Sequence, residues 1–397
     1  MRFTTLALKI YLVCFILSLI LFLIDRYRSK KLKPLREDKI SILIPCYNDG
    51  NSLVATVKSV YHAYDPANFQ LIVVNDCSTD DSLSKLQKIQ SEYGFTLIDN
   101  PENIGKALSL NKVSDLAIYD ILLVLDADNV LEKRHITSML ARMQKNDRVA
   151  AVSCPYVPKN HGFLPAMTNI EYIMLDMVQG SYNLFGAIAL RGGCLMVKKS
   201  AFIQVGKFSP WMLTEDLDLA FKLNKAGYKV QQSLERIQSL VPTNFKSRCK
   251  QKLRRNSGGA HCFIKYPRVW IKNPLHIMLI FSFCLLIFSL ATQTAFSFDV
   301  IKNMISKPNA RDAFWAVFDI KWRVEFFVTK TAYAFLSLPY IFPLITSLKT
   351  LWKILWIFPY SLIYIPLYSI MGFISIIHAI THYRKFEKIG KKGGRVR

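Results

Sequence analysis

The pattern of apolar and polar positions divides the chain into a middle region and two ends. In the middle, short apolar runs alternate with stretches of helical spacing. The runs predict strands, at residues 40–44, 69–74, 96–98 and 121–125. The spacing predicts helices, at residues 52–64, 80–92, 104–116 and 132–144. Repeated strand–helix units with continuously apolar strands indicate an α/β fold with a mostly parallel sheet and helices on both faces.

The ends of the chain carry much longer apolar windows. These windows span residues 6–24, 275–296, 326–346 and 354–380. Each is close to, or longer than, the roughly 20 residues that a helix needs to cross a bilayer. Apolar runs of this length are rare in soluble domains, so we expect transmembrane helices on both sides of the α/β domain.

The basic residues predict how the chain is oriented. Six Lys and Arg residues follow the first window between positions 26 and 36, and no small-residue cleavage site is visible there. A signal peptide carries its charge before the apolar run, so we expect an uncleaved anchor. Basic flanks stay in the cytoplasm, which places the middle domain and the basic tail, residues 382–397, on that side.

The cytoplasmic tail conflicts with a simple count of spans. Three spans after a cytoplasmic domain would leave residues 382–397 outside the cell. Either the fourth window is a hairpin or a helix broken at Pro359 and Pro366, or one window only dips into the membrane. The sequence leaves both solutions open.

These patterns predict five parts in an integral protein of the cell's inner or plasma membrane. The parts are an anchor (1–25), a basic cytoplasmic linker (26–39), a cytoplasmic catalytic domain with interface helices (40–272), a C-terminal region of three or four spans (273–381) and a basic cytoplasmic tail (382–397). One apolar, Met-rich segment inside the domain, residues 163–185, fits either a helix at the membrane interface or a core helix.

Composition narrows the classes of partner. The formal net charge is +24, from 52 Lys and Arg against 28 Asp and Glu. Such a balance is typical of nucleic-acid-binding proteins or of membrane proteins with basic flanks. Because this excess of basic residues lies beside apolar windows, we expect membrane lipids as partners and no nucleic acid.

The sequence has no C-x-x-C, G-x-G-x-x-G or G-K-[ST] motif, so no zinc ribbon, dinucleotide site or P-loop is indicated. The cysteines of the middle domain are expected to be free thiols.

Two carboxylates follow the most apolar predicted strand, in "YDILLVLDADNV". Alternate residues of an extended chain point to the same side, so Asp126 and Asp128 are expected to converge. Two close carboxylates repel each other, and a divalent cation such as Mg²⁺ or Mn²⁺ removes that conflict. The alternative is that the pair only caps the next helix.

Two further motifs add candidate chemistry. "MLTEDLDLAFKL" places Glu215 and Asp216 at the start of an amphipathic helix. The alternative is that Thr214 only caps this helix and that the two acids interact favourably with the helix dipole in its first turn. "CKQKLRRNSGG" offers a glutamine and arginines beside flexible glycines, and its alternative is a solvated basic face.

Taken together, these motifs resemble those of membrane-embedded family 2 glycosyltransferases. This group contains the poly-N-acetylglucosamine, hyaluronan, chitin and cellulose synthases, and the chain is most similar to the bacterial poly-N-acetylglucosamine synthases. The resemblance covers roughly residues 40–272 and rests on "IPCYND", "VVNDCSTDDS", "NIGKALSLN", "LDADN", "RGGCLMVKKSAFIQVGKF", "TEDLDLAFKL" and "QKLRRN". It implies a GT-A type fold.

The resemblance also implies roles for individual residues on the donor side. A nucleotide pocket is expected to include Tyr47 and Asp49, with Asp76 near the base or ribose. Lys106 is expected to approach the nucleotide, and Asp126 to lie near the ribose.

Further implied roles concern the metal and the acceptor. Asp128 is expected to bind Mg²⁺ or Mn²⁺ on the diphosphate. Asp216 is expected to be the base for the acceptor hydroxyl, with Thr214 and Glu215 shaping that site. Gln251 and Arg254 match the family's Q-x-x-R-W element near the diphosphate and acceptor.

The chain departs from the family pattern at two positions. Asn75 stands where the family often has Asp, and Arg255 stands where the Q-x-x-R-W element has Trp. That Trp offers an aromatic face to an acceptor sugar, so its loss puts processive chain growth in doubt. Arg255 can stack but carries charge. Trp211 is either an alternative platform or a packing residue.

The function expected from the resemblance is inverting, metal-dependent transfer of a sugar from a UDP-sugar to a growing β-linked polysaccharide at the membrane. N-acetylglucosamine is the expected sugar. Saccharides or lipids are the expected acceptors, and accessory secretion subunits are a further class of partner. Two alternatives stay open: a lipid glycosyltransferase similar to ceramide glucosyltransferases, and a non-catalytic membrane partner.

Overall fold

The computed structural model describes residues 2–187, 189–271, 371–372 and 374–382. Its strands are β1 (Ile40–Cys46), β2 (Phe69–Asn75), β3 (Thr96–Asp99), β4 (Ile121–Leu125), β5 (Val149–Ser153), β6 (Tyr156–Pro158), β7 (Cys194–Lys198), β8 (Lys229–Gln232) and β9 (Ile237–Ser239). Its helices are α1 (Arg2–Lys30), α2 (Gly50–Ala63), α3 (Ser82–Tyr93), α4 (Lys106–Ser114), α5 (Lys133–Lys145), α6 (Phe163–Tyr182), α7 (Lys199–Gln204), α8 (Glu215–Lys225), α9 (Phe245–Lys265) and α10 (Pro267–Ile271), with the 3-10 turn η1 at Pro66–Asn68.

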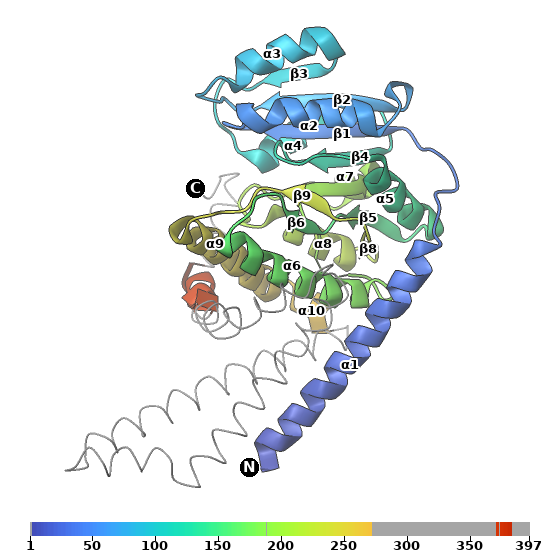
Figure 1. Cartoon of the computed structure of the whole chain (residues 1–397), viewed down its shortest axis with the longest axis vertical. Helices are drawn as coiled ribbons and strands as arrows, with labels where there is room; N and C mark the ends of the chain where they lie inside the picture. Colours follow the sequence, from blue (N-terminus) through green and yellow to red (C-terminus); the bar gives the residue numbers. More distant parts are fainter. Residues whose placement is uncertain (1, 188, 272–370, 373, 383–397) are drawn as a thin grey trace, which may run out of the picture.

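Seven strands form one mixed sheet, in the order β3-β2-β1-β4-β7-β5-β8 (Figure 1). Parallel pairs join β3, β2, β1 and β4, and a further parallel pair joins β5 and β8. β7 runs antiparallel to both of its neighbours. β6 and β9 form a separate parallel pair.

The alternation of side chains along the strands fills two cores. In β1, Ile40, Ile42 and Ile44 face one side and pack with residues of α2, α3 and α5. Leu43 faces the other side and packs with residues of α4, α7 and α8. Burial on both faces explains why the strands read as continuous apolar runs. The expected α/β fold with helices on both faces of a mostly parallel sheet is confirmed.

The predicted elements agree with the structure to within about two residues at each end. The fourth predicted strand has the predicted limits, 121–125, and the helix predicted at 132–144 is found at Lys133–Lys145. The antiparallel direction of β7 was not predicted. An apolar run shows that a strand is buried but carries no information about its direction in the sheet.

The parallel strands bring the polar motifs together. β1 pairs with β2 and with β4, so the carboxyl ends of these three strands lie side by side. The segments that follow them begin at Tyr47, Asp76 and Asp126. Ligand sites in such sheets lie beyond the carboxyl ends of the strands, which makes this edge the place to look for chemistry.

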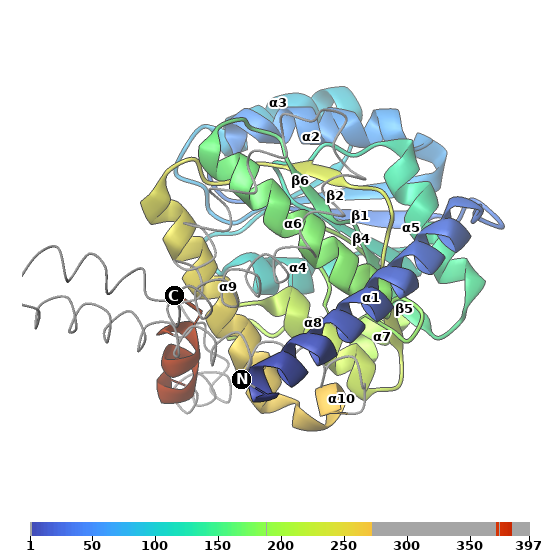
Figure 2. The same ribbon diagram turned by 60° about the horizontal axis from the view of Figure 1, so that its bottom comes forward.

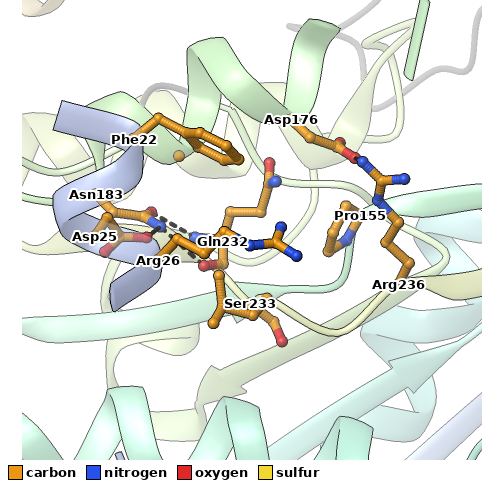
Figure 3. A pocket seen from close by; sticks show the side chains of 11 residues that line it. Phe22, Asp25, Arg26, Pro155, Asp176, Asn183, Gln232, Ser233 and Arg236 are labelled. Carbon is orange, nitrogen blue, oxygen red and sulfur yellow. Dashed lines mark hydrogen bonds and ion pairs between the residues drawn. The ribbon is translucent and has the colours of Figure 1, made fainter. Parts of the chain in front are cut away.

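The long helix α1 packs along α6, as both ribbon views show (Figures 1 and 2). Its last turns are fixed to the domain by a buried ion pair, in which Arg142 Nη2 lies 2.8 Å from Asp25 Oδ2. Asn183 Nδ2 donates to the same oxygen at 3.0 Å, beside a small cavity between α1, α6 and the loop after β8 (Figure 3). Removing one partner of such a buried pair is costly, so the contact holds α1 firmly.

Helix α6 corresponds to the apolar segment whose position the sequence left open. Twelve of its twenty residues are buried, and Gly180 meets the ring of Phe22 from α1. A Cβ on Gly180 would lie 2.7 Å from that ring, so the two helices approach closely. The segment therefore packs as a helix against the domain and α1.

Within the described residues, no helix combines the length and apolarity that crossing a membrane requires. The expected spans at 275–296 and 326–346 lie outside the described residues, as does most of the window at 354–380. The expected domain limits in the C-terminal region also fall there.

Candidate active site

An open cleft with about 410 Å³ of free volume lies at the carboxyl ends of β1, β2 and β4. This volume is typical of small-molecule sites, which occupy about 300–1,000 Å³. The residues that line it are Pro45, Cys46, Tyr47, Asp49, Asp76, Lys106, Asp126, Ala127, Asp128, Glu215 and Arg254. Eight of the thirteen site residues expected from the sequence are among them. The other five, Thr214, Asp216, Trp211, Gln251 and Arg255, do not line it.

Lys106 is the central cation of the cleft. It begins α4, directly after Gly105, and its Nζ lies 2.5 Å from Asp126 Oδ1 and 3.7 Å from Glu215 Oε1. Burial lowers the pKa of Lys106, but the charges of Asp126 and Glu215 outweigh burial and raise the pKa above its usual value. Lys106 therefore stays protonated and links the end of β4 to the start of α8.

Asp76 holds the loop that places Lys106. Its Oδ1 accepts from the Ile104 amide at 2.9 Å and its Oδ2 from the Gly105 amide at 2.6 Å. Asn100 Nδ2 and Ser109 Oγ also donate to Oδ1, at 3.1 and 3.0 Å. Asp76 also lines the cleft, and its expected place near the base or ribose stays a prediction.

The carboxylates of Asp49, Asp126 and Asp128 line the same cleft as Lys106. Burial raises the pKa of Asp49, and the charge of Asp126 adds to that rise. Burial and the charge of Asp126 likewise raise the pKa of Asp128. Mutual repulsion of this kind is what a cation or a lysine relieves.

The end of β9 holds Asp128 by one oxygen. Its Oδ2 accepts from the Leu240 amide at 3.1 Å and from Ser239 Oγ at 3.4 Å. No described group bonds Oδ1. One oriented oxygen and one open oxygen suit a residue that contributes a single ligand to a cation.

The described residues contain no group of three or more His, Cys, Asp and Glu side chains arranged to hold a metal by themselves. Mg²⁺ and similar ions are often bound by one or two carboxylates together with substrate phosphates. The oxygen-only set of Asp49, Asp126 and Asp128 lines the cleft, and the raised pKa values of Asp49 and Asp128 fit that mode of binding.

The two acids at the start of α8 have different partners. Glu215 faces the cleft, and burial raises its pKa although the charge of Lys106 opposes the rise. Asp216 Oδ2 accepts from the Gly192 amide at 2.8 Å, and Oδ1 from the Leu217 amide at 2.8 Å. Asp216 is thus held rigidly next to the cleft, in contact with the segment before β7.

Thr214 is the N-cap residue of α8 but makes no side-chain cap bond. Its hydroxyl instead lies 3.9 Å from Cys262 Sγ, and its side chain meets Gly258 of α9. The alternative interpretation of Thr214 as a capping hydroxyl is therefore wrong.

The six cysteines of the middle domain are free thiols, as expected.

Helix α9 presents its arginines in different directions. Arg254 reaches the cleft and donates to the Leu213 carbonyl at 2.9 Å. Gln251 Oε1 instead accepts from Arg248 Nη1 at 2.6 Å. Arg255 lies with its guanidinium 5.8 Å from the ring centre of Tyr172 on α6.

Trp211 packs rather than lining the cleft. Its ring lies 5.7 Å from the His261 ring, and Lys265 Nζ lies 4.0 Å above it. This cation–π contact engages one face of the ring.

Sequence reasoning missed the residues that connect these groups. Gly192 bonds to Asp216 and Lys106, Gly193 bonds to the Asp126 amide, and Tyr156 in turn accepts from the Gly193 amide. The signal was present, because "RGGCLMVKK" belongs to the motifs that carry the resemblance. Glycines give no side-chain chemistry to interpret, and Tyr156 lies outside every quoted motif.

Comparison with known proteins defines the class of this domain. Residues 41–206 match the family model "Glycosyl transferase family 2". These residues contain the strands and most of the acids of the cleft, so the chain carries a family 2 glycosyltransferase domain. Such a domain implies a nucleotide-sugar donor.

The curated relatives make the resemblance more specific. The chain is 29% identical over 247 residues to the poly-beta-1,6-N-acetyl-D-glucosamine synthase of Staphylococcus aureus, a match that covers 60% of each chain. It is 29% identical over 230 residues to the enzyme of the same name from Staphylococcus epidermidis, covering 57% of this chain and 56% of the relative. The match therefore spans about 60% of the length of these distant relatives.

Among solved structures, the fold is similar to that of a mannosyltransferase from Pyrobaculum calidifontis, solved in complex with GDP-Man and Mn²⁺. The TM-score is 0.57 at 17% sequence identity, and the match covers 87% of this chain and 99% of that one. At this identity the likeness concerns the fold alone.

Proposed function

We propose that the protein is an inverting, metal-dependent glycosyltransferase that transfers N-acetylglucosamine from UDP-N-acetylglucosamine to a growing β-linked polysaccharide at the membrane. The observation that carries the proposal is the single cleft in which Lys106, Asp126, Asp128 and Arg254 converge. Cations and carboxylates in one site match a substrate whose leaving group is a charged diphosphate.

Donor binding is assigned to the strand ends and to α4. Tyr47 and Asp49 follow β1 and supply an aromatic ring and a carboxylate for the nucleoside. Asp76 acts through the 104–106 loop that it holds, and Lys106 approaches the nucleotide while neutralising Asp126. Arg254 enters from α9 and offers a fixed positive charge to the diphosphate.

A divalent cation fits the carboxylate side. Asp128 would hold Mg²⁺ or Mn²⁺ through its open oxygen, with Asp126 nearby. When bound, such an ion stabilises negative charge on the departing diphosphate. The manganese of the Pyrobaculum calidifontis mannosyltransferase complex supports this choice of ion.

Asp216 is assigned as the base that takes the proton of the acceptor hydroxyl. Two backbone amides fix its carboxylate at 2.8 Å each, which orients the group for proton transfer. Glu215 and Thr214 shape the site around it. Attack from the side opposite the leaving group inverts the anomeric centre, so an α-linked donor gives a β-linked product.

Gln251, Arg255 and Trp211 are assigned to the acceptor side, at some distance from the donor cleft. Arg255, at the position of the missing tryptophan, lies with its guanidinium 5.8 Å from the centre of the Tyr172 ring. Membrane attachment rests on the apolar windows of the sequence and on α1, where Val13, Ile16 and Ile20 expose 64%, 45% and 48% of their surface. Lipid would remove that apolar surface from water.

The test of the function is a nucleotide-sugar screen with the purified full-length protein in detergent and Mn²⁺, using released nucleotide diphosphate as the readout. We expect release from UDP-N-acetylglucosamine and a β-linked saccharide product. A glycolipid product would support the lipid glycosyltransferase instead. No release from any nucleotide sugar would overturn the proposal.

A further inference from the structure

A pair of glycines before β7 bonds to both sides of the cleft. The Gly192 amide donates to Asp216 Oδ2 at 2.8 Å, and the Gly192 carbonyl accepts from Lys106 Nζ at 3.3 Å. The Gly193 carbonyl accepts from the Asp126 amide at 2.9 Å and from Asn129 Nδ2 at 2.7 Å. Through these four hydrogen bonds, Gly192 and Gly193 connect the proposed base, Asp216, to Lys106 and to the Asp126–Asn129 segment on the proposed donor side.

This arrangement leaves no room for a side chain at Gly193 and little room at Gly192. A Cβ on Gly193 would lie 2.5 Å from the Tyr156 hydroxyl, 2.9 Å from Asn129 Nδ2 and 2.9 Å from Asp126 Oδ2. A Cβ on Gly192 would lie 3.1 Å from Asp216 Cβ. The close approach explains why two glycines occupy these positions, because contacts below 3.0 Å force a neighbouring atom to move.

The remaining polar group of Gly193 is held by Tyr156 of β6. The Gly193 amide donates to the Tyr156 hydroxyl oxygen at 2.6 Å. Burial, together with the charges of Asp126 and Asp216, raises the pKa of Tyr156 well above its usual value. The phenol is therefore neutral at any working pH and can serve as a stable acceptor for this amide.

A chain of buried contacts fixes the Tyr156 ring in turn. The Arg191 guanidinium lies 5.3 Å from the centre of that ring, and Arg191 Nη2 donates to Asp176 Oδ1 at 2.7 Å. The second oxygen of Asp176 lies 2.9 Å from Arg236 Nη2 (Figure 3). Asp176 belongs to α6, so the ring is fastened to the same helix that packs on α1.

We propose that Tyr156 is a positioning residue: by fixing Gly193, it sets the placement of Asp216 relative to Asp126 and Lys106. The inference rests on the proposed function, because it matters only if Asp216 meets an acceptor beside a bound donor. A reacting group displaced by about 1 Å can cost about 100-fold in rate. The phenol thus controls transfer without touching substrate.

The first variant is Tyr156→Phe, which removes one oxygen and keeps the ring on Arg191. We expect kcat for transfer to fall about 10- to 100-fold with a smaller change in donor KM. The ratio of sugar transferred to UDP released should also fall, because a misplaced base no longer favours the acceptor over water. A purely structural role would lower the amount of active protein and leave this ratio unchanged.

Tyr61→Phe is the matched control. The Tyr61 hydroxyl donates to the Tyr93 carbonyl at 2.7 Å and its ring packs on Phe69, at the start of β2, the opposite end from the cleft. This variant also removes one phenol oxygen bonded to the backbone. We expect unchanged transfer per UDP released.

Gly193→Ala provides an independent test of the same contact. Its new methyl group meets the Tyr156 oxygen first, so we expect a larger loss than for Tyr156→Phe. In the double variant, removing that oxygen opens part of the space, and the combined loss should be smaller than the product of the two single losses.

The outcomes separate the inference from the proposed function. An active wild type with a reduced transfer ratio in Tyr156→Phe, and coupling to Gly193→Ala, supports the inference. An active wild type with an unchanged ratio in Tyr156→Phe overturns the inference and leaves the function standing. A wild type that releases UDP from no nucleotide sugar overturns the function and the inference together.

Discussion

The ammonium of Lys106 lies 2.5 Å from Asp126 Oδ1 and 3.7 Å from Glu215 Oε1. One cation therefore joins the end of β4 to the start of α8, across the cleft assigned to the donor. The carboxylates hold Lys106 in place, and the lysine in turn reduces the repulsion between them.

Lys106→Met should weaken donor binding if Lys106 approaches the nucleotide as proposed, because the cleft loses a positive charge and Asp126 loses its partner. Loss of a charge-assisted contact costs about 1.5–3 kcal/mol, or about 10- to 100-fold in affinity. Titration calorimetry with the nucleotide sugar measures the change. Lys58→Met on the exposed side of α2 is the control, and equal affinities of the two variants would contradict the assignment.

Arg255→Trp tests the position at which the chain departs from its family. If an aromatic ring here holds a growing neutral chain, the substitution should lengthen the product with little change in donor affinity, because Asp128 and Arg254 line the proposed donor cleft and Arg255 does not. Product lengths are compared with wild type at matched turnover. A lower rate with a higher acceptor requirement would instead indicate that Arg255 pairs with an anionic acceptor, and identical profiles would remove residue 255 from the acceptor site.

Glu171→Gln should destabilise the domain strongly. Glu171 on α6 pairs with Lys252 and, at 2.8 Å, with Arg248 Nη2, whose side chain is fully buried. Removing one partner of a buried pair costs about 3–5 kcal/mol because a charge stays buried without compensation. The thermal unfolding midpoint measures the loss. Glu37→Gln, which removes an exposed pair with Lys133, should change the midpoint very little.

The same ion pairs predict how stability depends on pH. Burial raises the pKa of Glu171, but the charges of Lys252 and Arg248 outweigh burial and lower it from 4.5 to about 2. A lowered folded-state pKa contributes stability that is present above the unfolded value and is lost as the pH falls toward the folded value. The wild-type midpoint should therefore fall between about pH 4.5 and pH 2. A fall of the same size in Glu171→Gln would show that other groups cause it.

The sequence predicted the alternating elements and the carboxylates that follow β4, because both depend on local patterns. Asp126 and Asp128 follow an apolar run that could only be a buried strand, and parallel pairing then brought them to Asp49. The connections across the cleft depend on tertiary packing. The antiparallel β7 carries Gly192 and Gly193 to Asp216 and Lys106, and no periodicity in the chain indicates that direction.

Individual side chains show the same limit. Gln251 lies in the expected motif but bonds Arg248 instead of lining the cleft, and Asp76 is engaged by donors of its own chain. A motif indicates the helix on which a residue lies. The hydrogen-bond partner of that residue depends on which side chains the tertiary fold places beside it. The position of Tyr156 is set by the β6–β9 pair, which is three residues long and too short to give a clear pattern in the sequence.

The central claim is that Asp216 takes the acceptor proton while the cleft lined by Asp128 holds the donor. The most direct measurement compares wild type with Asp216→Asn for binding of UDP-N-acetylglucosamine with Mn²⁺ and for sugar transfer under the same conditions. An amide keeps the size of the side chain but cannot accept the proton. The account predicts donor affinity close to wild type and transfer reduced to background. Transfer close to wild type, or a loss of donor affinity as large as the loss of rate, would contradict it.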